Sequence, residues 1–198
     1  TKFIMRFPPL WIPPEVTFDN FTKLLTRQPF LHYITNSLTV ATIVTVGQVV
    51  ISAFSAYAFA RLRFPGRDKL FLLYLATMVI PVQVTLIPQY VLVSQLGWID
   101  SYAALTVPML SSAFLTFLLR QYFLSLPGEL EEAARIDGAG YWRIFVTIIL
   151  PLSGPALATS ALLAFIGNWT NYLWPLIVTR SREMRTVPVG LASFQDEM

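Results

Sequence analysis

Long stretches without charged side chains are the feature of this sequence that most limits how it folds. Residues 36–60 contain no charged residue over 25 positions. At about 1.5 Å per residue, a helix of that length exceeds the roughly 30 Å hydrocarbon core of a bilayer. Within this segment Ser52, Ala56 and Ala60 recur every four residues, which puts small side chains on one face where another helix approaches closely. The segment is predicted to be a transmembrane helix that packs against a neighbour.

Three more segments are uncharged and long enough to span a bilayer. They are residues 70–93, 102–119 and 152–178. Pro81, Pro88 and Pro108 predict kinks within them, whereas Pro151 suits the first turn of the last one, where a backbone N–H is not needed. A hydrophobic content of 55%, a charged content of 13% and a mean hydropathy of +0.60 agree with this reading. We predict an all-α polytopic membrane protein with four transmembrane helices.

The remaining residues divide the chain into three parts. Residues 1–35, rich in proline, are expected to be an external or interfacial segment with a short amphipathic helix near residues 17–25. Residues 36–178 form the transmembrane domain, which contains a polar loop at 125–150. Residues 179–198, of mixed polarity, are expected to be an external loop.

The cations lie between the apolar segments, and their distribution predicts an orientation. Arg61, Arg63, Arg67 and Lys69 crowd one short loop, while residues 94–101 contain no Lys or Arg. Short loops rich in Lys and Arg are typically cytoplasmic, so the polar loop at 125–150 is predicted to face the cytoplasm. A net charge of +3 distributed in this way does not indicate a nucleic-acid partner.

Metal and disulfide chemistry are not expected. The sequence has no cysteine, which excludes disulfides and thiolate ligands, and its single histidine, His32, lies beside aromatic residues. We expect no metal site.

Five polar side chains within the apolar segments are candidates for a solute pathway. These are Gln83, Gln89, Asn168, Asn171 and Tyr172. Amides inside a membrane are costly unless something satisfies them. Two interpretations stay open: the side chains line a path for a polar solute, or they only bind neighbouring helices.

The polar loop is predicted to contain two short helices. A turn at 125–128 is followed by three glutamates that open the first helix, where carboxylates interact favourably with the helix dipole. Glu131 and Arg135 are spaced to pair across one turn, at a gain of only tenths of a kcal/mol if exposed. Gly138 and Gly140 are expected to adopt positive φ and end this helix. A second short helix then leads into the last span.

The spacing of residues in this loop is specific. Glu132, Ala133 and Ala134 are followed after three residues by Gly138, and after nine more by an isoleucine, one further residue, and Leu150 with Pro151. This array resembles the EAA signature of permease subunits from bacterial binding-protein-dependent ABC importers. The stretches DGAGYWRIF, FIGNWTNYLWPLIV and TVPVGLASF resemble sugar-type systems, in particular the smaller permease subunit of maltose-type importers.

The resemblance implies that the first short helix is a cytoplasmic coupling helix that docks in a groove of an ATP-hydrolysing subunit. Glu132 would meet a basic or polar group there, Ala133 and Ala134 would permit close approach, and Gly138 would supply the turn. Asp137, Leu150 and Pro151 belong to the same implied coupling set.

The resemblance also implies partners and a location. The expected partners are an ABC ATPase subunit, a second permease subunit, membrane lipid, and an external solute-binding protein near residue 98 and residues 179–198. Because the sequence lacks a G-x-x-x-x-G-K-[ST] loop, the chain is expected to be non-enzymatic and to bind no cofactor, with ATP used by the partner. The expected location is the bacterial inner membrane, multi-pass, with a carbohydrate or similar polar solute as cargo.

Members of this family have six spans, so the chain is expected to be a fragment that corresponds to the part between the first span and the last. Two alternatives from other classes stay open. A secondary transporter or channel would be expected to carry intramembrane Asp, Glu or Arg, and none lies in the four segments. A structural membrane scaffold would use its intramembrane amides only to bind helices.

Overall fold

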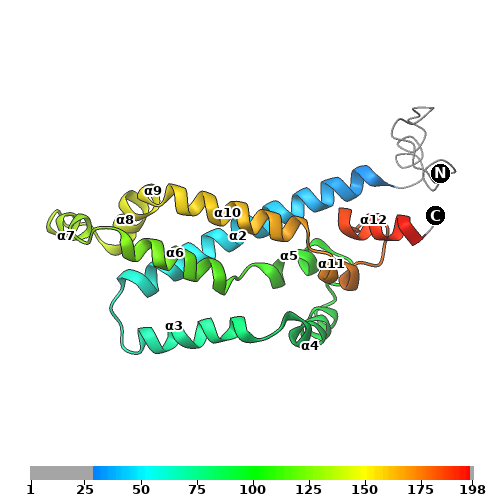
Figure 1. Cartoon of the computed structure of the whole chain (residues 1–198), viewed down its shortest axis with the longest axis horizontal. Coiled ribbons are helices and arrows are strands. Elements are labelled where there is room, and N and C mark those ends of the chain that lie inside the picture. The colour runs from blue at the N-terminus through cyan, green and yellow to red at the C-terminus, as the bar shows by residue number, and fades with distance from the viewer. Residues whose placement is uncertain (1–28, 197–198) are drawn as a thin grey trace, which may run out of the picture.

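The computed structural model describes the backbone of residues 29–196 and the side chains of residues 29–193. The amphipathic helix predicted near residues 17–25 lies outside this part of the chain. All regular secondary structure within the described residues is helical, which confirms the all-α prediction. The helices form an elongated bundle (Figure 1).

The first long helix, α2 (Phe30–Arg61), confirms the first predicted span and begins six residues before it. It is long and apolar enough by itself to cross a membrane. The small-residue face predicted for it is buried, with Ser52 and Ala56 fully enclosed and Ala60 7% exposed. This face packs in the core shared with α6 (Ala113–Ser125).

The second uncharged segment folds as two helices at nearly a right angle, not as one kinked span. The helix α3 (Arg67–Ala76) continues into the 3-10 turn η1 (Thr77–Val79), and α4 (Val82–Gln95) leaves at 95°. Pro81 lies at the break with extended backbone, ψ 136°. Proline lacks the N–H that would continue the helix. Pro88, in contrast, stays inside α4.

The third segment is bent as predicted, but the break follows Pro108. The helix α5 (Tyr102–Thr106) and the 3-10 turn η2 (Val107–Met109) meet α6 at 43°. Ser112 caps α6 by accepting a hydrogen bond from the Leu115 N–H at 3.3 Å. The helix then runs to Ser125, six residues beyond the predicted end of the span.

The fourth segment differs most from the prediction of one helix over 152–178. The polar loop contains α7 (Glu129–Ile136) and then α8 (Tyr141–Ile144), a π-helical turn (Phe145–Ile149) and α9 (Leu150–Leu152). After a 77° bend, α10 runs from Gly154 to Trp169, and α11 (Leu173–Val178) follows as a separate helix.

Three corrections follow from these bounds. Pro151 lies in α9 before the bend, and not at the start of the long helix. Asn171 and Tyr172 lie between α10 and α11, so they do not extend the face that carries Asn168. Residues 187–196, expected to be a loop, form the helix α12 (Val187–Asp196).

Two buried clusters hold the bundle together, one toward each end. The first contains Ala53, Ala56, Tyr57, Ala60, Leu119, Phe123, Ile144, Phe145, Ile149 and Ala156. The second contains Val40, Val44, Val93, Ala104, Leu105, Trp174 and Val178. Figure 1 places α7, α8 and the α2–α3 turn at one end, and α11 and α12 at the other. The two loops predicted to share a side do share an end.

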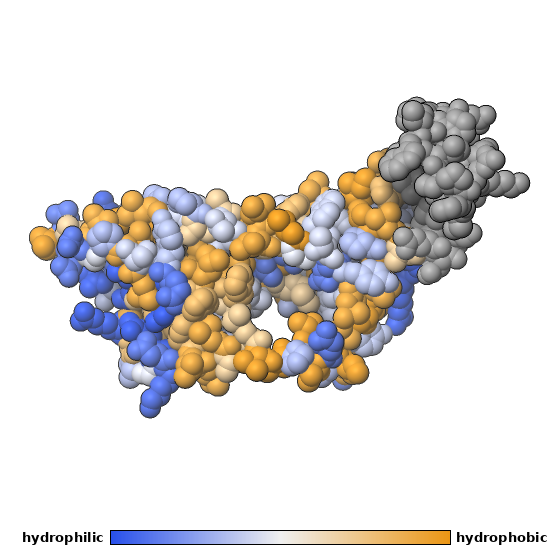
Figure 2. Space-filling model, in the orientation of Figure 1, coloured by the Kyte–Doolittle hydropathy of each residue, from blue (hydrophilic) through white to orange (hydrophobic). Residues whose placement is uncertain are grey.

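The surface is apolar over much of its length. Leu72, Val79 and Ile87 are each more than 65% exposed. Figure 2 shows hydrophilic side chains gathered at the end that carries α7, with hydrophobic surface over the middle of the molecule. Besides α2, three helix pairs bent at short breaks are long and apolar enough to cross a membrane if each pair counts as one span.

Candidate coupling segment and polar cavity

The helix α7 ends as its sequence predicts. Gly138 has φ +80°, and its N–H donates to the Arg135 carbonyl at 3.0 Å, while the Ala139 N–H donates to the Ala134 carbonyl at 2.9 Å. This pair of bonds is the Schellman arrangement, which satisfies the last helical carbonyls and requires the left-handed conformation that glycine adopts at little cost. Gly140, however, has φ −76°, so the expectation of positive φ there is wrong.

A buried ion pair anchors the inner face of α7. The Arg61 Nε atom lies 3.0 Å from Glu131 Oε1, and the two side chains are 14% and 7% exposed. The same guanidinium donates hydrogen bonds to the carbonyls of Phe123 and Leu126. The predicted partner Arg135 lies farther away, at 3.7 Å, and is 47% exposed. Arg61 therefore joins the end of α2 to the end of α6 and to α7.

A second arginine fixes the same end of the bundle. The Arg120 Nε donates to the Phe59 carbonyl at 3.2 Å, and its guanidinium lies 4.1 Å from the centroid of the Phe71 ring. Its Nη2 atom is 3.7 Å from Asp68 Oδ1. These contacts tie α6 to both α2 and α3.

Aromatic contacts attach α8 to α2. Trp142 stacks on Phe54 with ring centroids 5.7 Å apart, and Phe145 lies 4.8 Å from Tyr57. The Tyr57 hydroxyl donates to the Tyr141 carbonyl at 3.2 Å. These contacts hold α8 and the π-helical turn after it against α2.

The candidate coupling segment, residues 129–151, is open on its outer face. Glu132, Ala133, Asp137, Gly138 and Pro151 are exposed, whereas Leu150 is half-buried. Ala134 is also half-buried and packs on the chain's own core. The small side chain of Ala134 therefore lets α7 pack closely against the core of this chain.

Apolar side chains interrupt this polar face, and sequence reasoning missed them. Ile136 is 87% exposed, Trp142 65% and Tyr141 57%. A cavity of about 330 Å³ lies beside them, lined by residues 138–141 and Arg135. Large exposed apolar side chains among charges are typical of a protein interface. The available sequence signal was an isoleucine that follows Arg135 at the end of a helix with three glutamates.

A cavity that combines apolar walls with three polar side chains lies between α2, α6 and α10. Its volume is about 360 Å³, and its polar lining comes from Gln48, Ser112 and Asn168. The Asn168 Nδ2 donates to Gln48 Oε1 at 3.2 Å and to the Ala164 carbonyl at 2.8 Å. The Gln48 Nε2 donates to the Met109 carbonyl at 2.6 Å. Gln48 was missed, although it is an amide in an uncharged span like the two glutamines that were selected.

The other predicted pathway residues lie elsewhere. Gln83 is exposed and Gln89 half-buried on α4, and Asn171 is half-buried after α10. Tyr172 lines a separate cavity of about 120 Å³ near α12. The structure therefore pairs Asn168 with Gln48 across two helices.

The two segments expected to meet an external protein form one surface. Asp100 Oδ1 accepts hydrogen bonds from the backbone N–H groups of Arg180, at 2.8 Å, and Ser181, at 3.0 Å. Burial raises the pKa of the Asp100 carboxyl, but these hydrogen bonds outweigh it and hold the pKa below its ordinary value. The Asn36 Nδ2 donates to the Arg185 carbonyl at 3.0 Å and ties the same segment to α2.

No group of three or more His, Cys, Asp or Glu side chains that could hold a metal ion occurs within the described part of the chain.

Comparisons with known proteins place these features in context. The sequence pattern of the family described as "Binding-protein-dependent transport system inner membrane component" matches residues 48–196. The sn-glycerol-3-phosphate transport system permease protein UgpE of Brucella abortus (strain 2308) is 47% identical over 161 residues, which cover 81% of this chain and 57% of that protein. The protein of the same name from Yersinia enterocolitica is 44% identical over 165 residues, covering 83% and 59%.

A solved structure is also similar. It is the crystal structure of a bacterial ABC transporter involved in the import of the acidic polysaccharide alginate, with a TM-score of 0.82 and 28% sequence identity. The match covers 93% of this chain and 64% of that one. The chain thus spans less than two thirds of the length of these relatives.

Proposed function

Because the chain belongs to the family of inner membrane components of binding-protein-dependent transport systems, we propose that it acts as a permease subunit of an ATP-driven importer. The family resemblance found in the sequence is thereby confirmed. The named relatives are transport permeases, which agrees with the prediction that the chain is not an enzyme. In this role the chain contributes part of a solute path and receives motion from an ATPase that is a separate subunit.

One observation carries the proposal for coupling: α7 is exposed on its outer face and is held to the bundle on its inner face by a buried ion pair. Outward, Glu132 and Asp137 stand beside the exposed Ile136, a mixture of charge and apolar surface that suits a docking partner. Inward, the Glu131–Arg61 ion pair at 3.0 Å fastens α7 to α2. A push on α7 then moves the long helices instead of bending the loop.

The cavity lined by Gln48, Ser112 and Asn168 is the proposed contact point for solute. Its amides and the Ser112 hydroxyl offer both donors and acceptors, which suits a solute rich in hydroxyl groups. The relatives named above are a sn-glycerol-3-phosphate permease and an alginate importer. We therefore propose a carbohydrate or a similar polar solute as cargo.

The proposed setting is a multi-pass protein of the bacterial inner membrane. The spans would be α2 and the three bent helix pairs, four in total. The proposed partners are an ABC ATPase at α7, a second permease subunit, and an external solute-binding protein at the surface where Asp100 meets Arg180. ATP would be used by the ATPase subunit, and no cofactor or nucleic acid is part of the proposal.

Charge reversal on α7 tests the coupling role. Glu132→Lys is expected to reduce copurification of the ATPase and solute-stimulated ATP hydrolysis severalfold. Glu129→Lys is the matched control, because it makes the same charge change at an exposed position in the same helix but outside the signature. Normal association and normal stimulated hydrolysis in Glu132→Lys would refute the coupling role.

Substitutions in the cavity test the solute path. Gln48→Ala and Asn168→Ala are expected to raise the KM for uptake or change solute preference in the assembled transporter. Gln83→Ala serves as the control, since Gln83 is exposed on α4. Unchanged KM and preference in both cavity variants would favour a scaffold role for these amides.

A further inference from the structure

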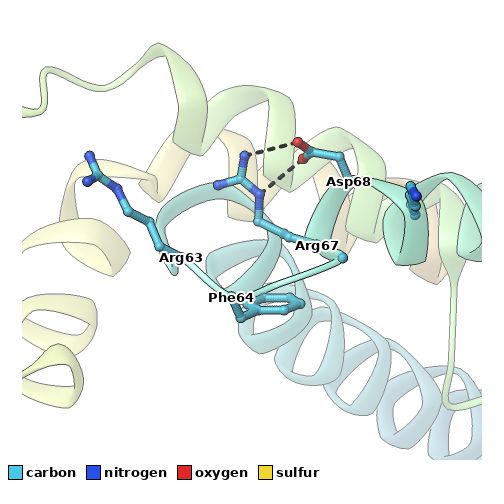
Figure 3. Close-up of a pocket in the computed structure, with 6 residues that line it drawn as sticks. Arg63, Phe64, Arg67 and Asp68 are labelled. Carbon is cyan, nitrogen blue, oxygen red and sulfur yellow. Dashed lines mark hydrogen bonds and ion pairs between the residues drawn. The ribbon is translucent and has the colours of Figure 1, made fainter.

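The turn between α2 and α3 borders a cavity that is separate from α7 and from the proposed solute path. The cavity has a volume of about 570 Å³. It is lined by Arg63, Phe64, Gly66, Arg67, Asp68 and Lys69. Figure 3 shows Arg63 and the Arg67–Asp68 pair on the same side of the turn, with Phe64 at its tip. The turn takes its shape from Gly66, whose φ is +79°.

The charges around this cavity are not balanced. Three cations and one carboxylate leave a net charge of +2 over residues 63–69. Asp68 is already engaged by Arg67, with Nε and Oδ1 3.0 Å apart, and by Arg120. The side chains of Arg63 and Lys69 make no ion pair or hydrogen bond with any residue that the structure describes. Two exposed cations are therefore open to an external anion.

An apolar surface begins where the cations end. Phe64 is 36% exposed in the turn, and Leu70, Leu72 and Leu73 are 51%, 69% and 68% exposed on α3. A free phosphate ion would use only the cations. An amphiphilic anion would use both the cations and the leucines, which are exposed in the single chain.

We propose that this turn binds the headgroup of an anionic phospholipid. Arg63 and Lys69 receive the phosphate, and the acyl chains lie along the exposed leucines of α3. Arginine and lysine at the end of an apolar helix are suited to this task, because each basic side chain near an anionic membrane surface adds attraction that zwitterionic lipid does not supply. The inference rests on membership of an inner-membrane family and does not depend on the solute or on the coupling role of α7.

Lipid binding to the purified protein tests the proposal. The protein in neutral detergent is titrated with phosphatidylglycerol, with phosphatidylcholine of the same acyl chains, and with inorganic phosphate, and bound molecules are counted by native mass spectrometry. Phosphatidylglycerol should bind best. Arg63→Gln and Lys69→Gln should each weaken that binding about fivefold, and the double variant about thirtyfold, from about 1 kcal/mol per cation.

The control is Arg143→Gln, which removes one exposed cation from α8 at the same end of the molecule. It should leave lipid binding unchanged. An equal loss in Arg143→Gln would show a general charge effect and overturn the proposal, as would equal binding of the two lipids. If inorganic phosphate bound as tightly as phosphatidylglycerol, the turn would be a site for free anions and not for lipid, and the proposal would be overturned. Helicity measured by circular dichroism verifies that each exposed-site variant is folded.

Discussion

Removing one partner of the Arg61–Glu131 pair should release α7 from the bundle. Glu131→Gln keeps the shape of the side chain but leaves the buried Arg61 charge without its carboxylate. The α7 helix has eight residues, and a helix of that length is not stable in water without tertiary contacts. The loss should therefore appear as local opening of α7 and not as unfolding of the whole bundle.

The size of the effect follows from the contacts of each side chain. Breaking a buried ion pair by removing one partner costs about 3–5 kcal/mol. Glu131→Gln belongs at the lower end, because Arg61 keeps the carbonyls of Phe123 and Leu126 as acceptors. Arg61→Met belongs at the upper end, because those carbonyls and Glu131 all lose their donor. At about 1.4 kcal/mol per factor of ten, about 3 kcal/mol corresponds to a change of about 150-fold in an opening equilibrium.

Hydrogen exchange of the α7 amides measures this opening. Exchange in Glu131→Gln should accelerate by up to about 150-fold, limited by the protection that α7 has to lose. Glu132→Gln, at an exposed position of the same helix, is the control and should change the opening free energy by less than about 0.5 kcal/mol. The double variant Arg61→Met/Glu131→Leu should be less damaging than either single removal, since no buried charge remains unpaired. Equal exchange rates in Glu131→Gln and Glu132→Gln would show that the Arg61–Glu131 pair does not hold α7 in place.

Three further predictions concern backbone geometry and one carboxylate. Gly138→Val should fray the end of α7 at a cost of about 1–2 kcal/mol, because φ is +80° at this position although open space surrounds the added side chain. Gly140→Ala, at φ −76°, is the control, and equal hydrogen exchange of α7 in the two variants would contradict the role of Gly138. Gly190→Ala should lower the Tm in detergent by an amount that reflects about 1–3 kcal/mol, because its Cβ would overlap the ring of the buried Tyr33; an unchanged Tm would show that α12 is not held there. Asp100 has a pKa below its ordinary value, so the stability it adds is complete above about pH 4 and is lost as the pH falls through its folded-state pKa. The Tm advantage of the wild type over Asp100→Asn should shrink below about pH 4, and a constant advantage would contradict the assignment.

The sequence was sufficient for the class of the fold and for the bounds of α7. Uncharged segments long enough to cross a bilayer report how residues partition between water and lipid, and that property does not depend on tertiary structure. The end of α7 was predictable because Gly138 satisfies a local rule for ending helices. The placement of the polar loop and the α2–α3 turn at one end followed from counting the segments between them.

The angles between helices and the contacts between residues distant in sequence were not predictable from local patterns. The hydropathy of residues 70–93 is the same for a straight helix and for two helices at 95°. The sequence therefore predicts only a kink at Pro81 and not a right angle. Arg61 and Glu131 are 70 positions apart, and no local pattern joins them. Gln48 carries the same local signal as Gln83 and Gln89, an amide in an uncharged segment, but only the structure pairs it with Asn168 from another helix.

The right angle between α3 and α4 means that the shape of this segment differs from a single membrane span. Residues 70–93 form one uncharged stretch that is long enough to cross a bilayer. A break in a helix frees backbone groups that hydrocarbon does not satisfy, so within a membrane the corner at Pro81 would need protein or water to cover it. Val79 and Ile80 are still 81% and 49% exposed at this corner in the single chain. We therefore expect contact with a partner subunit, and not insertion alone, to complete this corner.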